Sequence, residues 1–129
     1  MRRAYRKRAG TAVTAVRLDL DTDGLLYRKW GAQQRGKPGD WLVDNDGDVY
    51  TVDATSFAAT YERTSPGRYH KRVPVWAERA ERAGEVRTRE GVTRHVAGDY
   101  LVANDVDGKD AYAMSAERFH RLYEPIETP

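Results

Sequence analysis

The chain of 129 residues contains no cysteine, which excludes disulfide bonds, thiolate zinc sites and cysteine nucleophiles. It also lacks a hydrophobic run long enough to cross a membrane, and no apolar stretch follows its first residues, so we expect neither a membrane span nor a secretion signal. A large excess of one charge is missing too, because 22 basic residues stand against 20 acidic ones. These absences predict a cytoplasmic protein with mixed surface charge.

The one concentration of charge is at the N-terminus. Five basic residues crowd this short segment: Arg2, Arg3, Arg6, Lys7 and Arg8. Such an arm could bind nucleic acid or another acidic partner. A solvated, partly frayed terminus is the commoner outcome, and it is the one we expect.

The chain does contain an internal sequence repeat of two copies. Gly-Asp-Trp-Leu-Val-x-Asn-Asp at residues 39–46 returns as Gly-Asp-Tyr-Leu-Val-x-Asn-Asp at residues 98–105. The match extends upstream to Tyr-x-Lys-Arg at residues 5–8 and 69–72. Two copies usually pack about a pseudo-twofold axis.

The repeats set the predicted domain organisation. We predict a single compact domain over residues 1–129, built from repeat 1 (5–62) and repeat 2 (69–124). Each repeat is shorter than roughly 60 residues, a size at which a separate core is marginal, so we expect the halves to share one core.

Each repeat reads as strand, variable connection, strand, Gly-Asp turn, strand, hairpin, strand and helix. Asp46-Gly47 is typical of a tight hairpin turn, and Asp53 and Ser115 are suited to cap the closing helices. In the second copy, the spacing of Ala and charged residues from Trp76 to Ala83 predicts an additional short helix. The fold class is therefore α+β and mainly antiparallel β, arranged as a partly closed barrel or as two facing sheets.

The aromatic residues of the closing helices are predicted to be core. Phe57 and Tyr61 lie four residues apart and share one helical face, and Phe119 and Tyr123 repeat this spacing. Repetition at helical spacing is what core packing requires. We therefore do not interpret these aromatics as a cofactor site.

Several of these motifs resemble the little-characterised PGDYG family of bacterial and phage proteins. The family's Pro-Gly-Asp-aromatic turn stands at residues 38–41, and residues 97–100 repeat it with Ala in place of Pro. The upstream Thr-x-Glu-Gly signal is present only at residues 88–91, whereas the first copy has Lys-Trp-Gly at residues 29–31. The resemblance implies no particular reaction, because the family has no established one.

Asp40 and Asp99 are the only candidates for catalysis. Two equivalent aspartates could meet at the pseudo-axis and share a proton, as in hydrolases with a carboxylate dyad. The favoured interpretation is a Gly-Asp turn, in which the carboxylate accepts hydrogen bonds from backbone N–H groups and glycine supplies an unusual φ.

No metal site or cofactor is predicted. Asp19-x-Asp21-x-Asp23 imitates the start of a calcium loop, but Trp30 stands where that loop needs a bidentate glutamate. The three histidines have neither the spacing nor the neighbouring carboxylates of a metal site: His70, His95 and His120.

The best candidate site is a polar and aromatic surface on the strands that precede the two Gly-Asp turns. Alternation along a strand would place basic and aromatic side chains on one exposed face, able to stack on a ring or hold an anion. The plainer alternative is an ordinary strand edge defended by Lys and Arg. The predicted ligand-binding residues are Arg28, Lys29, Trp30, Arg87, Arg89 and Glu90.

The sequence favours a small non-enzymatic binding or regulatory module that recognises a small anionic ligand or a protein partner at the repeat junction. A first alternative is nucleic-acid binding through the basic N-terminal arm and the Arg/Lys-rich strands. A second alternative is a hydrolase with the aspartate dyad. No membrane partner is expected, and a homodimer is compatible with the pattern. We expect residues shared by the repeats to build the fold and unshared ones to carry function.

Overall fold

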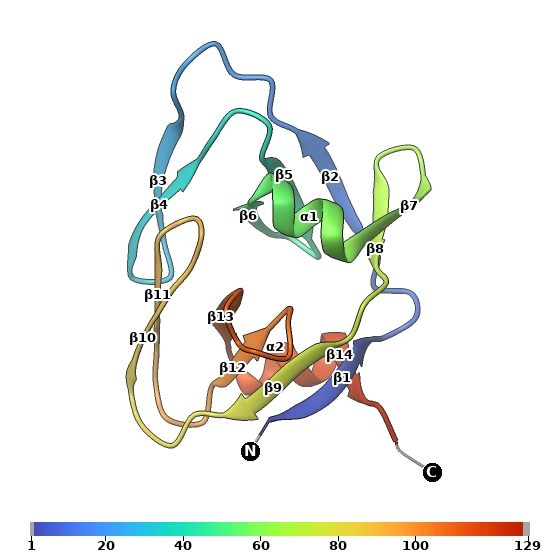
Figure 1. Ribbon diagram of the computed structural model, residues 1–129, viewed down its shortest axis with the longest axis vertical. Helices are drawn as coiled ribbons and strands as arrows, with labels where there is room; N and C mark the ends of the chain where they lie inside the picture. The colour runs from blue at the N-terminus through green and yellow to red at the C-terminus, as the bar shows by residue number, and fades with distance from the viewer. Residues whose placement is uncertain (1, 128–129) are drawn as a thin grey trace.

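The computed structural model describes residues 2–127, which form mostly antiparallel strands with two short helices. Two five-stranded sheets and two two-stranded hairpins account for the described strands, and these close into no barrel. In Figure 1 the two larger sheets lie one above the other, with both hairpins along one side.

The upper sheet in Figure 1 has the strand order β6-β5-β2-β8-β7 and carries helix α1. Its elements are β2 (Val13–Arg17), β5 (Trp41–Asn45), β6 (Asp48–Val52), α1 (Ala54–Thr60), β7 (Tyr61–Ser65) and β8 (Arg68–Lys71). The lower sheet has the order β13-β12-β9-β1-β14 and carries helix α2. Its elements are β1 (Arg3–Lys7), β9 (Val75–Arg79), β12 (Tyr100–Ala103), β13 (Ala111–Met114), α2 (Ala116–Leu122) and β14 (Tyr123–Pro125).

The two repeats exchange their first strands. β1 belongs to repeat 1 by sequence, yet it pairs with β9 and β14 of repeat 2. β8 belongs to repeat 2, yet it pairs with β2 and β7 of repeat 1. Each sheet therefore contains four strands of one repeat and the first strand of the other, which ties the halves together through backbone hydrogen bonds.

The N-terminal basic segment is a strand, so the expectation of a frayed terminus is wrong, although Arg2, Arg3 and Arg6 are exposed to solvent as expected. β1 lies between β9 and β14, with Tyr5 and Lys7 buried on one side. Two arginines of this segment bind residues of the C-terminal part of the chain. Arg6 pairs with Glu124, and Arg8, which follows β1, donates to the carbonyl of His120. Strand exchange, which a local pattern cannot reveal, orders this segment.

The helix predicted from Trp76 to Ala83 is also wrong, because β9 occupies Val75–Arg79 and Gly84 begins another strand. Val75 and Ala77 point into the core, and β9 pairs with both β12 and β1. Hydrogen bonding on both sides of the strand outweighs the modest helix propensity of alanine and glutamate.

The two hairpins are β3 (Leu25–Lys29) with β4 (Ala32–Gly36), and β10 (Gly84–Arg87) with β11 (Val92–His95). They touch where Gln34 forms a bridge with Gly91, and the Arg35 N–H donates to the carbonyl of Glu90. A Cβ on Gly91 would lie 2.4 Å from the carbonyl oxygen of Gln33, so this close approach requires glycine.

The predicted helix caps and aromatic contacts are confirmed. Asp53 and Ser115 accept hydrogen bonds from the first turns of α1 and α2. The Phe57 ring stacks between Trp41 and Tyr61 at centroid distances of 4.2 and 4.7 Å. In the other half, Phe119 stacks in the same way between Tyr100 and Tyr123.

These stacks belong to two hydrophobic clusters, so the expectation of one shared core is wrong. One cluster forms around Phe57 beneath α1, and the other forms around Phe119 beneath α2. Each takes a tyrosine from the exchanged strand: Tyr69 contacts Phe57, and Tyr5 contacts Phe119. The cavity described next is lined by residues of both halves.

Candidate functional site

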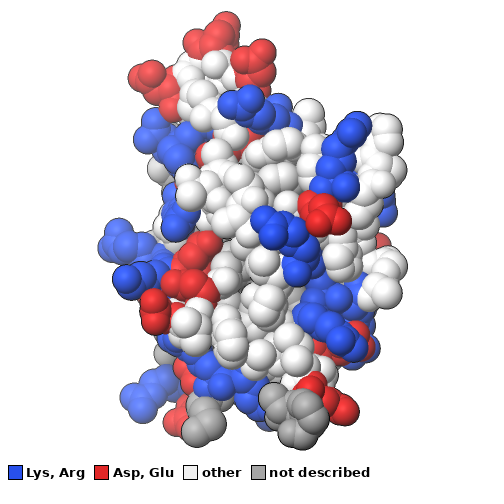
Figure 2. All heavy atoms as spheres, turned by 45° about the vertical axis from the view of Figure 1, so that its right-hand side comes forward, with Lys and Arg blue, Asp and Glu red and all other residues white. Residues whose placement is uncertain are grey.

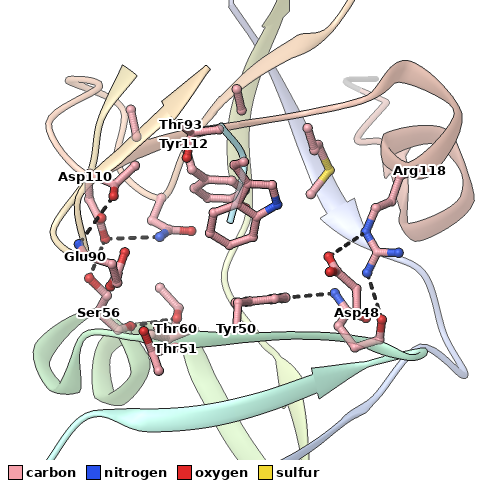
Figure 3. A pocket seen from close by; sticks show the side chains of 18 of the residues that line it. Asp48, Tyr50, Thr51, Ser56, Thr60, Glu90, Thr93, Asp110, Tyr112 and Arg118 are labelled. Atoms are coloured by element: carbon pink, nitrogen blue, oxygen red, sulfur yellow. Dashed lines mark hydrogen bonds and ion pairs between the residues drawn. The ribbon is translucent and has the colours of Figure 1, made fainter. Parts of the chain in front are cut away.

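A cavity of about 310 Å³ lies at the junction of the repeats. Asn45 and Tyr50 line it from the upper sheet, Tyr112 and Met114 from the lower sheet, and Trp30 from a hairpin. Figure 3 shows its two unlike ends, with Asp110, Glu90 and Ser56 at one and Arg118 with Asp48 at the other. A cavity lined by several elements is a usual place for a ligand.

Lys71, the last residue of β8, is the central cation of this cavity. Its side chain is only 6% exposed, and its Nζ donates to Asn104 Oδ1 at 3.0 Å, Tyr112 Oη at 3.0 Å and Tyr123 Oη at 3.2 Å. All three acceptors are uncharged. Lys71 forms no salt bridge with a described carboxylate, although buried lysines are normally paired.

This environment changes the protonation of Lys71. Burial, together with the positive charge of Lys7, lowers the pKa of Lys71 to about 7, and the charge of Asp110 opposes this effect only partly. The protonated and neutral amine are therefore both populated near neutral pH. A negative charge placed beside the ammonium would favour the protonated form.

Tyrosines surround this amine. The Lys71 Nζ lies 5.5 Å from the ring centroid of Tyr61, 5.2 Å from that of Tyr112 and 5.8 Å from that of Tyr123. Burial raises the pKa of each of these hydroxyls, and it raises that of Tyr50 to about 12. The hydroxyls therefore stay protonated and can both donate and accept hydrogen bonds.

The matched lysine, Lys7 at the end of β1, has a different environment. Its Nζ donates to the backbone carbonyl of Thr11 at 3.0 Å. Burial and the positive charge of Arg118 lower the pKa of Lys7 to about 8. Arg118 donates to the carbonyl of Asn45 at 2.7 Å and pairs with Asp48 at 3.5 Å.

The two ends of the cavity differ at a matched helix position. Arg118 is the third residue of α2, and the third residue of α1 is Ser56. Ser56 donates to Asp110 Oδ2 at 2.8 Å, and Asn104 donates to the same oxygen at 3.0 Å. Lys71 is therefore linked through Asn104 to the carboxylate of Asp110, whereas the charge that acts on Lys7 is the guanidinium of Arg118, itself paired with Asp48.

The predicted ligand-binding residues are divided by the structure. Trp30 and Glu90 line the cavity, while Lys29 pairs with Asp48 at 2.6 Å and Arg89 pairs with Asp53 at 3.1 Å. Arg28 and Arg87 are exposed on their strands and do not line it. The expected single basic face is therefore wrong, because strand alternation directs Arg28 away from its two half-buried neighbours.

Trp30 is unusual in its backbone. It lies at the tip of the β3–β4 hairpin with a φ of 57°, in the left-handed region that large side chains rarely adopt. The carbonyl of Trp30 accepts from the Arg94 N–H at 3.0 Å, and its ring lies 5.4 Å from that of Tyr50. Contact between the hairpins and the cavity wall thus holds Trp30 in place.

Glu90, the only acid among the predicted ligand-binding residues, links a hairpin to α1. Its Oε2 accepts the Asp53 N–H at 2.7 Å, and burial raises the pKa of the Glu90 carboxyl. Asp53 also pairs with Lys37 and Arg89, and hydrogen bonds to the helix N–H groups outweigh its partial burial and lower its pKa. These contacts close one wall of the cavity.

Asp40 and Asp99 lie in two Gly-Asp turns, as the favoured interpretation predicted. Asp40 Oδ2 accepts the Lys37 N–H, and Asp99 Oδ2 accepts the Val96 N–H, each three residues back. The preceding glycines have φ values of 89° and 93°. The two carboxylates share no hydrogen bond, and they precede strands of different sheets.

Sequence reasoning missed the residues around the Lys71 amine. Lys71, Tyr112 and Tyr123 all have counterparts in the first repeat, and residues shared by the repeats were expected only to build the fold. One signal was available, since a lysine at the same place in both repeats precedes an apolar stretch each time. A conspicuous charge beside core positions indicates a buried polar site.

Comparisons with protein-family models, with curated proteins and with solved structures find no match to this chain. The resemblance to the PGDYG family therefore stays a prediction. Within residues 2–127 there is no cluster of His, Cys, Asp or Glu that could hold a metal ion. No helix in the described part of the chain is long and apolar enough to cross a membrane.

Proposed function

We propose that this chain is a non-enzymatic binding module that takes a small anionic ligand into the cavity between its repeats. The observation that carries the proposal is the Lys71 ammonium, buried at the cavity with three uncharged hydrogen-bond partners. A buried cation without a carboxylate partner is costly. A ligand anion would supply the missing negative charge.

The size of the cavity limits the ligand. At about 310 Å³ it is at the lower end of ligand pockets, which suits a small metabolite rather than a large cofactor or a folded partner. Arg118 adds a second cation, with N–H groups left over after its contacts to Asn45 and Asp48. An anion could therefore be held from two sides.

Affinity should depend on pH in a defined direction. An anion beside Lys71 favours the ammonium, so the pKa of Lys71 in the complex lies above its value of about 7 in the free protein. Binding then takes up a proton between these two pKa values. Affinity is highest below pH 7 and falls by up to about tenfold per pH unit as the pH rises above it.

Thermal unfolding with a panel of small anions and nucleotides tests the proposal. An anion at about 100 times its Kd stabilises the protein by about 2.7 kcal/mol, and the shift should be larger at pH 6 than at pH 8.5. Lys71→Met should abolish the shift. Lys109→Met, the same change at an exposed lysine, should keep it.

If folded Lys71→Met protein retains the full shift, the assignment of the anion to Lys71 is wrong. A shift produced only by polynucleotides and lost with salt would favour the nucleic-acid interpretation instead. Acidic and basic side chains are interspersed on the face drawn in Figure 2, so that interpretation has no particular support there. A protein partner or a homodimer at the junction stays a prediction.

We also propose that the two repeats form one α+β domain about a pseudo-twofold axis passing near this cavity. The identical strand orders of the two large sheets and the reciprocal exchange of β1 and β8 support this arrangement. It accounts for the position of the ligand site, since matched tyrosines from both halves converge there.

A further inference from the structure

We propose that Lys71 is a nucleophilic amine that forms an imine with a small carbonyl compound carrying a carboxylate, such as a 2-oxo acid. The proposal deepens the proposed function, because it names a ligand class for the same cavity. Its basis is the placement of this amine: it lines the cavity, has no ion-pair partner among residues 2–127 and donates hydrogen bonds to two tyrosine hydroxyls.

The surroundings of Lys71 favour a neutral amine. Lysines become nucleophilic when they are desolvated or lie near another cation, and both conditions hold here. Burial and the charge of Lys7 lower the pKa of Lys71 to about 7, and Asp110 is the charged group that opposes them. The remaining titratable groups against the amine, Tyr61, Tyr112 and Tyr123, are neutral phenols.

Two tyrosines provide a path for the protons. The hydroxyls of Tyr112 and Tyr123 lie 3.2 Å apart, and each is within hydrogen-bond distance of the Lys71 Nζ. As the Nζ lone pair attacks the carbonyl carbon, a phenol can give its proton to the carbonyl oxygen and take one from Nζ. The phenol thus ends neutral, and no phenolate is required.

The reaction balances without another reagent. The C–N bond forms first and gives a carbinolamine. Its hydroxyl then takes a proton from a phenol and leaves as water while the nitrogen lone pair forms the C=N bond, and the N–H proton of the resulting iminium returns to that phenol. One amine and one carbonyl therefore yield one imine and one water. Arg118 lines the other end of the same cavity and is a second cation there.

The test compares pyruvate with lactate, which has the same charge but no carbonyl group. Wild-type protein is incubated at pH 7 with each compound and sodium cyanoborohydride, which reduces an imine to a stable secondary amine. Peptide mass mapping then locates any carboxyethyl group. With pyruvate we expect labelling of Lys71 at least about tenfold above that of the exposed Lys109, and none with lactate.

Three variants locate the chemistry. Lys71→Arg should lose the adduct while keeping a cation in the cavity, Tyr112→Phe should slow labelling at Lys71, and Lys109→Arg should change nothing at Lys71. The labelling rate of the wild type should be half-maximal near pH 7, as expected for the amine that reacts. An ordinary exposed lysine would keep gaining reactivity to a much higher pH.

The outcomes separate this inference from the proposed function. Equal labelling of Lys71 and Lys109, or no label at Lys71, overturns the imine. If pyruvate and lactate nevertheless both raise the melting temperature, anion binding stands by itself. If Lys71 is labelled while neither anion shifts the melting temperature without reductant, the imine stands and the anion site fails.

Discussion

Lys7 and Lys71 hold the same place in the two repeats, at the end of matched strands, but their partners differ. Lys71 meets two tyrosine hydroxyls and an asparagine, whereas Lys7 meets a backbone carbonyl. The helix residue at the matched position is Ser56 in one half and Arg118 in the other. A duplicated frame can therefore hold a single, asymmetric site when residues near its centre differ between the copies.

The largest expected effect tests whether the aromatic stacks of the two halves contribute equally to the stability of the fold. Phe57 and Phe119 are nearly fully buried in matched stacks, so Phe57→Ala and Phe119→Ala should each reduce the free energy of unfolding by about 3–5 kcal/mol. Urea unfolding of both variants measures this. A difference between the two variants of more than about 2 kcal/mol would contradict the view that the frames are equivalent.

A smaller effect should follow Arg118→Ser, which gives the second half the residue of the first. This change removes the bond to the Asn45 carbonyl and the pair with Asp48, and it should reduce the free energy of unfolding by about 1–3 kcal/mol. The pKa of Lys7 should rise, because Arg118 is one of the two causes that lower it.

Carbon NMR of the lysine Cε position across pH measures the change at Lys7. Arg121→Ser is the matched control, since Arg121 lies on the same helix and its ion pair is exposed. It should leave the pKa of Lys7 unaltered. An unchanged Lys7 pKa in Arg118→Ser would show that the two ends of the cavity do not differ through this arginine.

The smallest expected effect distinguishes Lys71 from Lys7 by the pH at which each makes the free energy of unfolding rise. Between pH 7 and 8 the unfolded chain binds a proton at residue 71 that the folded chain has largely lost, so the free energy of unfolding rises with pH by up to about 1.4 kcal/mol per unit. The penalty for burying this charge is fully present below pH 7. For Lys7 the corresponding rise begins only near pH 8.

Urea unfolding at several pH values checks this order. Lys71→Met should flatten the rise between pH 7 and 8. Lys7→Met should keep the rise but move it to higher pH, because the charge of Lys7 helps to lower the pKa of Lys71. If both variants keep the wild-type slope of unfolding free energy against pH in this range, the pKa values of Lys71 and Lys7 do not differ as proposed.

Local patterns predicted the features that depend on neighbours in sequence. Asp53 and Ser115 cap their helices because a short side chain there meets free N–H groups one turn later. The Gly-Asp turns at Asp40 and Asp99 formed as expected for the same kind of reason. The alanine and charged residues from Trp76 onwards predicted a helix that does not form, because pairing with two neighbouring strands decides the structure of that segment.

The sequence by itself determined the repeated frame, its turns and caps, and the aromatic residues that pack beneath each helix, since these follow from interactions over a few residues. Only the tertiary structure decided that the repeats exchange their first strands and form two cores. That exchange carries the basic N-terminus into the lower sheet and Lys71 into the upper sheet, from which Lys71 reaches Tyr112 and Tyr123 of the lower sheet. The site at Lys71 depends on hydrogen bonds to residues 33–52 positions away along the chain, and no local pattern predicts contacts over such a separation.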